Sequence, residues 1–182
     1  MAVIVLLAMG ADGVRDALRY EQGVWTATRL GGAHLVHLAW SHTLLNAAGL
    51  AVLGLLFSHR LRWYQWWLAA VFSAVAIDLG LALLSTEIGW YVGLSGVLHG
   101  LFVVGSVSEW RDGHRSGLYL LVGVVAKLIY EQGIGPLPMT ASAAGGPVVV
   151  DAHLYGALGG LVSCGLMRRG GPVHRRESGE SP

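Results

Sequence analysis

The chain has 182 residues, of which 54% are hydrophobic and only 13% are charged. Soluble domains carry about 25% charged residues, so this composition is typical of a membrane protein and argues against a soluble domain. The formal net charge is +1 and no basic stripe is present, so we expect no nucleic-acid partner. The single cysteine, Cys164, excludes an internal disulfide and lies in an apolar stretch, where a packing role is expected.

A short apolar segment at residues 2–10 opens the chain. It lacks the basic start and the cleavage site of a signal peptide. It is too short to span a membrane unless the helix continues to Leu18 past several charged residues. We therefore interpret it as a partial first span.

Five further apolar segments are each close to the roughly 20 residues that a spanning helix needs. They lie near residues 35–57, 63–84, 92–108, 117–132 and 148–167. The predicted fold is therefore all-α, a polytopic membrane helix bundle over residues 1–169, with six transmembrane helices of which the first is short or degenerate. Residues 170–182 are polar and rich in Gly, Ser and Pro, which is typical of a disordered tail.

Positive charges are distributed unevenly between the connecting loops. Arginines follow the second, fourth and sixth segments, at positions 60, 62, 111, 115, 168, 169, 175 and 176, whereas residues 85–92 and 133–147 contain no Lys or Arg. Basic loops stay in the cytoplasm. The pattern predicts a multi-pass protein with both termini cytoplasmic and residues 85–92 and 133–147 outside.

Polar side chains within the apolar segments are costly and by default mark a function or a paired structural role. His42 and Asn46 are four residues apart, as are Ser95 and His99, so each pair shares one helix face. Together with His153, these groups lie near the predicted outer ends of the second, fourth and sixth segments. If those helices are adjacent, a nucleophile, a base and hydrogen-bond donors for an oxyanion converge in one pocket.

Ser95 has two interpretations. Taken alone, a serine between Gly93 and Gly96 is more typical of the small-residue seam between two packed helices. As a nucleophile at a helix N-terminus, it would have free backbone N–H groups beside it, and the flanking glycines would allow close approach of a substrate. Gly156 and Gly160 form a small-xxx-small stripe that would let the sixth helix approach a neighbour closely.

These residues resemble the motifs of the rhomboid family of intramembrane serine proteases. The similar motifs are G-x-S-G at Gly93–Gly96, H-x-x-x-N at His42 and Asn46, and A-H-x-x-G-x-x-x-G from Ala152 to Gly160. The resemblance implies a catalytic pair of Ser95 and His153, with His42, Asn46 and the Ser95 backbone N–H as the oxyanion site. His153 has to be neutral to accept a proton, so activity is expected to fall at acid pH. No cofactor is implied.

The stretches GLSGVLHG, HLVHLAWSHTLLN, KLIYEQ and AHLYGALGGL resemble one subfamily, the rhombosortases. This implies a bacterial inner-membrane enzyme whose partners are single-span substrates with a Gly-rich C-terminal anchor of the GlyGly-CTERM type. His99 stands where many rhomboids have a tyrosine, and the resemblance implies that it stacks on or hydrogen-bonds to His153. Thr28-Arg29 replaces the Trp-Arg pair common in the family, a departure within the first external loop.

The sequence leaves the roles of several other polar residues open. Lys127 and Glu131 form an i, i+4 pair that is either structural or holds a polar substrate segment. Asp78 is either protonated or paired with Lys127, and Asp151 is expected as a helix-entry residue, because Asp is favoured at N-caps. His34 and His37 are expected to pack the external loop or to line a water path. The spacing of His34, His37 and His42 does not place all three on one helix face, so no metal site is predicted.

Two other functional classes remain. One is a catalytically inactive rhomboid-like protein that binds transmembrane helices. The other is a small transporter that uses the intramembrane histidines as a proton relay, which would predict an internal repeat that the sequence does not show.

Overall fold

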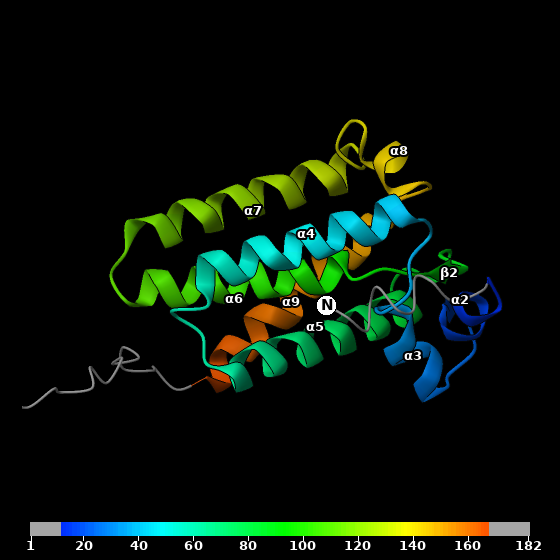
Figure 1. Ribbon diagram of the computed structural model, residues 1–182, viewed down its shortest axis with the longest axis horizontal. Coiled ribbons are helices and arrows are strands. Elements are labelled where there is room, and N and C mark those ends of the chain that lie inside the picture. The colour runs from blue at the N-terminus through cyan, green and yellow to red at the C-terminus, as the bar shows by residue number, and fades with distance from the viewer. Residues whose placement is uncertain (1–11, 168–182) are drawn as a thin grey trace, which may run out of the picture.

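The computed structural model describes residues 12–167, and five long helices dominate them (Figure 1). These helices are α4 (Trp40–Phe57), α5 (Trp63–Leu83), α6 (Ser95–Arg111), α7 (Arg115–Gly133) and α9 (Val150–Leu166). Each coincides with one of the five long apolar segments of the sequence. The proposed first span and the polar tail lie outside the described residues.

Two of these helices, α4 and α5, are long and apolar enough to cross a membrane within the described part of the chain. The outward faces of several helices are also apolar, since Leu55, Val122, Ile129 and Leu161 are all exposed. Exposed apolar surface of this extent is unusual on a soluble monomer and marks contact with another apolar phase.

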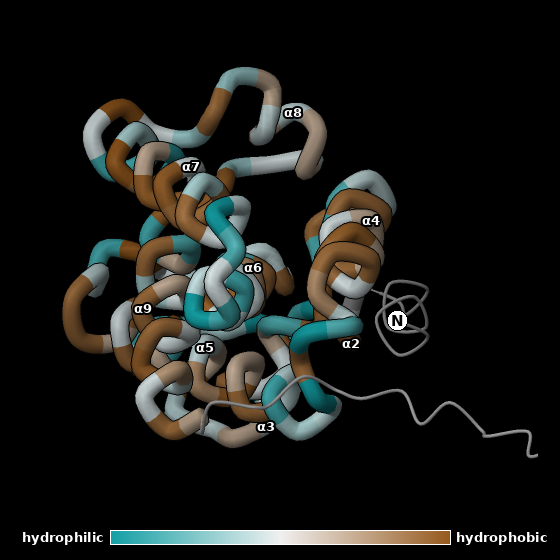
Figure 2. Tube along the Cα trace, turned by 90° about the vertical axis from the view of Figure 1, so that its left-hand side faces the viewer, coloured by the Kyte–Doolittle hydropathy of each residue, from teal (hydrophilic) through white to brown (hydrophobic). Residues whose placement is uncertain are grey.

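Helix α6 is the centre of the bundle (Figure 2). It packs against α9, α7, α5 and α4, and α5 packs in turn along α9. The second, fourth and sixth apolar segments form α4, α6 and α9, and α6 lies between the other two.

The two ends of the bundle differ in character. At one end, the turns after α4 and α6 hold Arg60, which lies 3.4 Å from Asp112 Oδ2 and 2.7 Å from His114 Nε2. At the opposite end, α6 and α9 begin, and the short helix α8 (Thr140–Ala144) precedes α9 (Figure 1). The basic turns and the N-terminal end of α6 are thus separated by the length of the bundle.

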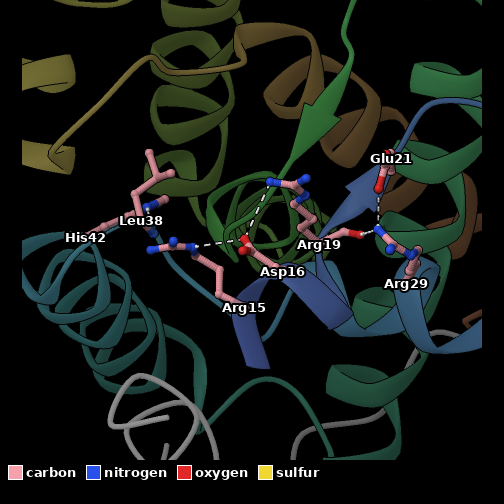
Figure 3. Close-up of polar contacts among 7 residues, drawn as sticks. All are labelled: Arg15, Asp16, Arg19, Glu21, Arg29, Leu38 and His42. Atoms are coloured by element: carbon pink, nitrogen blue, oxygen red, sulfur yellow. Dashed lines mark hydrogen bonds and ion pairs between the residues drawn. The ribbon is translucent and has the colours of Figure 1, made fainter. Parts of the chain in front are cut away.

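A small additional unit covers the N-terminal end of α6. It contains α2 (Asp12–Leu18), β1 (Tyr20–Glu21) and α3 (Ala27–Ala33), and β1 pairs antiparallel with β2 (Trp90–Tyr91) just before α6. Figure 3 shows the ion pairs within this unit, including Arg29 with Glu21 at 2.6 Å and Arg19 with Asp16 at 3.4 Å. Arg29 therefore has a carboxylate partner within this unit.

Candidate active site

Hydrogen bonds to both the N–H and the carbonyl of Gly93 hold the backbone just before Ser95. The Gly93 N–H donates to the Ala33 carbonyl at 2.9 Å, and the Tyr91 hydroxyl donates to the Gly93 carbonyl at 2.6 Å. Burial raises the pKa of Tyr91 above its ordinary value, so the phenol stays protonated and remains a donor. Gly93 has a φ of +124°, a conformation that only glycine adopts without strain, so this position requires glycine.

Ser95 is the first residue of α6, so its N–H and those of the next residues have no intrahelical acceptor. These donors and the positive end of the helix dipole lie beside the Ser95 hydroxyl. They are suited to stabilising a negative charge that develops there.

Helices α6 and α9 approach each other through glycines. A Cβ added at Gly156 would lie 2.0 Å from the Gly96 carbonyl oxygen, and one at Gly160 would lie 2.4 Å from the Gly100 carbonyl oxygen. A Cβ at Gly96 would lie 2.5 Å from the Ala152 carbonyl oxygen. Both backbones are therefore closer than any larger residue permits, which brings the first turn of α9 against the first turn of α6.

This approach places His153 beside Ser95. His153 Nε2 lies 3.1 Å from Ser95 Oγ, and the histidine is buried. On the other side of the ring, His153 Nδ1 lies 2.9 Å from Glu131 Oε2, a carboxylate on α7. A serine hydroxyl, an imidazole and a carboxylate thus form one continuous chain of contacts across three helices.

The ring of His99 stacks on that of His153, with the centroids 4.2 Å apart and an angle of 19° between the planes. His99 Nδ1 donates to the Ser95 carbonyl at 2.8 Å. The hydrogen bond holds His99 in place, and the stacked ring limits the movement of the His153 ring.

His42 and Asn46 lie on α4, across the N-terminal end of α6. The Leu38 N–H donates to His42 Nδ1 at 3.4 Å (Figure 3), which leaves the Nε2–H of a neutral ring as the free donor. A Cβ added at Gly93 would lie 2.9 Å from that Nε2, so the ring sits directly against the backbone before Ser95. The Asn46 amide instead donates to the His42 carbonyl at 3.1 Å.

A pocket of about 220 Å³ opens at this point. Ser95 and His42 line it together with Trp90, Tyr91 and the segment Pro147–Val149, and Asn46 does not. Of the residues predicted to supply oxyanion donors, Ser95 and His42 line the pocket, whereas Asn46 does not and donates to the His42 backbone carbonyl.

Two acidic residues make contacts that the sequence did not predict. Asp78 pairs with His34, whose Nε2 lies 3.2 Å from Asp78 Oδ1, and not with Lys127. Asp151 lies in the first turn of α9, as expected of a helix-entry residue, although the N-cap position itself is occupied by Val149. Its carboxylate accepts a hydrogen bond of 2.5 Å from Ser85. Both acids tie loops of the Ser95 end to the bundle, which sequence spacing within one helix does not reveal.

Within the described residues, His99, Glu131 and His153 could together hold a metal ion, since their ligand atoms all lie within 4.8 Å of one another. The Lys127 ammonium, however, lies 2.7 Å from Glu131 Oε2. A fixed positive charge at the same oxygen opposes a cation there, so this donor set fits a metal poorly.

Sequence reasoning did not place two residues at the site. Tyr91 gave no signal beyond an aromatic residue two positions before Gly93. Glu131 was seen only as the partner of Lys127, although an acid in an apolar helix was itself a signal that a second partner existed on another helix.

A family model described as the rhomboid domain matches residues 24–170. No curated protein and no solved structure matches the chain. Rhomboids are membrane proteins and generally intramembrane serine proteases, although some members are inactive. With more than three quarters of its length matched, this chain belongs to the rhomboid family.

Proposed function

We propose that this protein is an active intramembrane serine endopeptidase of the rhombosortase type. The observation that carries the proposal is the contact of 3.1 Å between Ser95 Oγ and His153 Nε2. A nucleophile and a base in hydrogen-bond reach are the minimum that peptide cleavage by a serine requires. An inactive relative would have no need to keep both groups in this geometry.

In the proposed reaction, Ser95 Oγ attacks the scissile carbonyl while its proton passes to His153 Nε2. His153 then gives this proton to the leaving amine, and an acyl-enzyme remains. Water, activated by the same histidine, releases the acyl group and restores the Ser95 hydroxyl. The oxyanion would be stabilised by the Ser95 backbone N–H and by the His42 Nε2–H. The Asn46 side-chain amide would support His42 by donating to its backbone carbonyl.

The proposed substrates are single-span proteins with a Gly-rich stretch before a C-terminal anchor of the GlyGly-CTERM type. A regular helix hides its carbonyls, and glycine lowers the cost of unwinding it by up to about 1 kcal/mol per residue. The pocket beside Ser95 lies among the loops at the end of the bundle opposite the basic turns. Basic turns in the cytoplasm would then place cleavage at the external face of a bacterial inner membrane, with both termini cytoplasmic.

The test is co-expression in a bacterium with a reporter that carries such an anchor. Wild type, Ser95→Ala and the control Ser58→Ala, an exposed serine at the end of α4, are compared by the mass of the reporter. We expect loss of the anchor with wild type and Ser58→Ala only. Cleavage that persists with Ser95→Ala contradicts the proposal.

A serine-reactive fluorophosphonate separates this function from that of an inactive helix-binding protein. Label that appears in wild type and is absent from Ser95→Ala supports the enzyme. If membrane-inserted wild type takes up no label at Ser95, the inactive alternative is favoured.

A further inference from the structure

Glu131 is the most deeply buried ionisable side chain near Ser95 among the described residues, with 1% of its surface exposed. Its Oε2 accepts from His153 Nδ1 at 2.9 Å and lies 2.7 Å from Lys127 Nζ. A buried carboxylate is costly unless other groups compensate its charge. Lys127 supplies the opposite charge, so His153 need not be protonated for Glu131 to remain ionised.

The contact also determines which ring nitrogen of His153 carries the proton. A carboxylate only accepts hydrogen bonds, so Nδ1 must be the N–H donor. In the neutral ring, Nε2 then presents its lone pair, and Nε2 is the atom that lies 3.1 Å from Ser95 Oγ. The opposite tautomer would have no lone pair directed at the serine.

The other ionisable groups around His153 are engaged elsewhere. His99 donates to the Ser95 carbonyl, Asp151 accepts from Ser85, and Asp78 lies beside His34. His42 faces Gly93 from α4. Glu131 is therefore the carboxylate in direct contact with the His153 ring in the part of the chain that the structure describes.

We propose that Glu131 is a positioning residue that makes the Ser95–His153 pair a Ser–His–Glu triad spanning α6, α9 and α7, with Lys127 as the counter-ion of the carboxylate. This rests on the proposed function. When Ser95 attacks, its proton moves to His153 Nε2, Nδ1 keeps its own proton, and Glu131 stays ionised and stabilises the imidazolium. No proton passes to the carboxylate.

The first experiment measures fluorophosphonate labelling of the full-length protein in membranes. Wild type is compared with Glu131→Gln and with Glu109→Gln, a control whose carboxylate accepts from Ser116 at the far end of α6. We expect Glu131→Gln to lower the maximal labelling rate by roughly 10- to 100-fold without weakening reversible probe binding, because positioning of the base is lost. Glu109→Gln should label like wild type, and equal rates for Glu131→Gln and wild type overturn the inference.

Glu131→Gln leaves Lys127 without its counter-ion and this alone could impair folding. The double variant Glu131→Gln/Lys127→Met removes both charges and keeps similar volumes. It should fold and still label slowly. Restoration of the wild-type rate in the double variant would mean that Glu131 serves only to neutralise Lys127, and would overturn the inference.

The second experiment does not depend on catalysis. In a Ser95→Ala background with ¹⁵N-labelled histidine, NMR should show a strongly downfield Nδ1–H resonance that disappears in His153→Ala and in Ser95→Ala/Glu131→Gln. Persistence of the resonance after Glu131→Gln overturns the inference, as does stoichiometric zinc binding that requires Glu131. If wild type takes up no label while the resonance behaves as expected, the proposed function fails and the hydrogen bond stands.

Discussion

The two flanks of α6 are packed by opposite means. On the flank toward α9, glycines of α6 and α9 pack directly against each other. Gly96, Gly156 and Gly160 leave no room for even a methyl group. Toward α4 and α7, an apolar cavity of about 400 Å³ opens, lined by residues such as Gly49, Phe102 and Gly123. The bundle is therefore closely packed where Ser95 and His153 must meet, and loosely filled on the flank where they do not.

His99 and Lys127 lie between the two regions. Both line the cavity, yet His99 stacks on His153 and Lys127 pairs with Glu131. One side of each residue faces the apolar cavity, and the other side contacts His153 or Glu131 near the interface between α6 and α9. His99 and Lys127 therefore connect the cavity with the side chains of the site.

The largest effect is expected from removing His153, the proposed base at the interface between α6 and α9. His153→Ala should abolish both reporter cleavage and labelling of Ser95, because Ser95 then has no proton acceptor. The measurement is labelling of membrane-inserted protein against Ser95→Ala as the blank. Labelling at the wild-type rate would contradict the assignment of His153 as the base.

A matched pair of glycine substitutions tests the contrast between the flanks directly. Gly156→Ala places a methyl 2.0 Å from a backbone oxygen of α6, so the two helices must separate and the Ser95–His153 contact lengthens. We expect a loss of about 1–3 kcal/mol in stability and a large fall in labelling. Gly123→Ala meets nothing within 4 Å and should leave both unchanged. Thermal unfolding in detergent and the labelling rate are the two readouts, and equal behaviour of the two variants would remove the distinction.

Substitutions of His99 test how strongly the position of His153 depends on the ring stacked against it. His99→Ala removes the stacked ring and should lower labelling by roughly tenfold, because the His153 ring gains freedom. His99→Phe retains a flat ring and should recover most of the rate, although it cannot donate to the Ser95 carbonyl. If His99→Phe is as slow as His99→Ala, the hydrogen bond to Ser95 matters more than the stacking.

The smallest effect is expected within the cavity. A Cβ at Gly49 would lie 3.0 Å from a terminal methyl of Leu98, which can rotate toward the free volume. Gly49→Ala should change the free energy of unfolding by less than about 1 kcal/mol and leave labelling intact. A loss as large as that of Gly156→Ala would show that the cavity flank is also tightly constrained.

Features that repeat along one helix were predictable from the sequence. The apolar segments predicted five long helices, and the i, i+4 spacing put Ser95 with His99 and Lys127 with Glu131 on common faces. Helical periodicity alone is sufficient for such inferences, because neighbours three or four residues apart must share a face whatever the tertiary structure.

Apart from the contacts of His153 with Ser95 and His99, which the family resemblance implied, the contacts between helices were beyond the sequence. The spacing of residues on α5, α7 and α9 did not predict that Asp78 pairs with His34, that Asp151 accepts from Ser85, or that Glu131 reaches His153. Such pairs depend on the rotation and axial offset of one helix against another. Side-chain packing over the whole interface sets both quantities. The sequence by itself thus determined the helices and the polar groups that each carries, and the motif resemblance paired Ser95 with His153. Only the tertiary structure decided which other groups meet across helices, Glu131 with His153 above all.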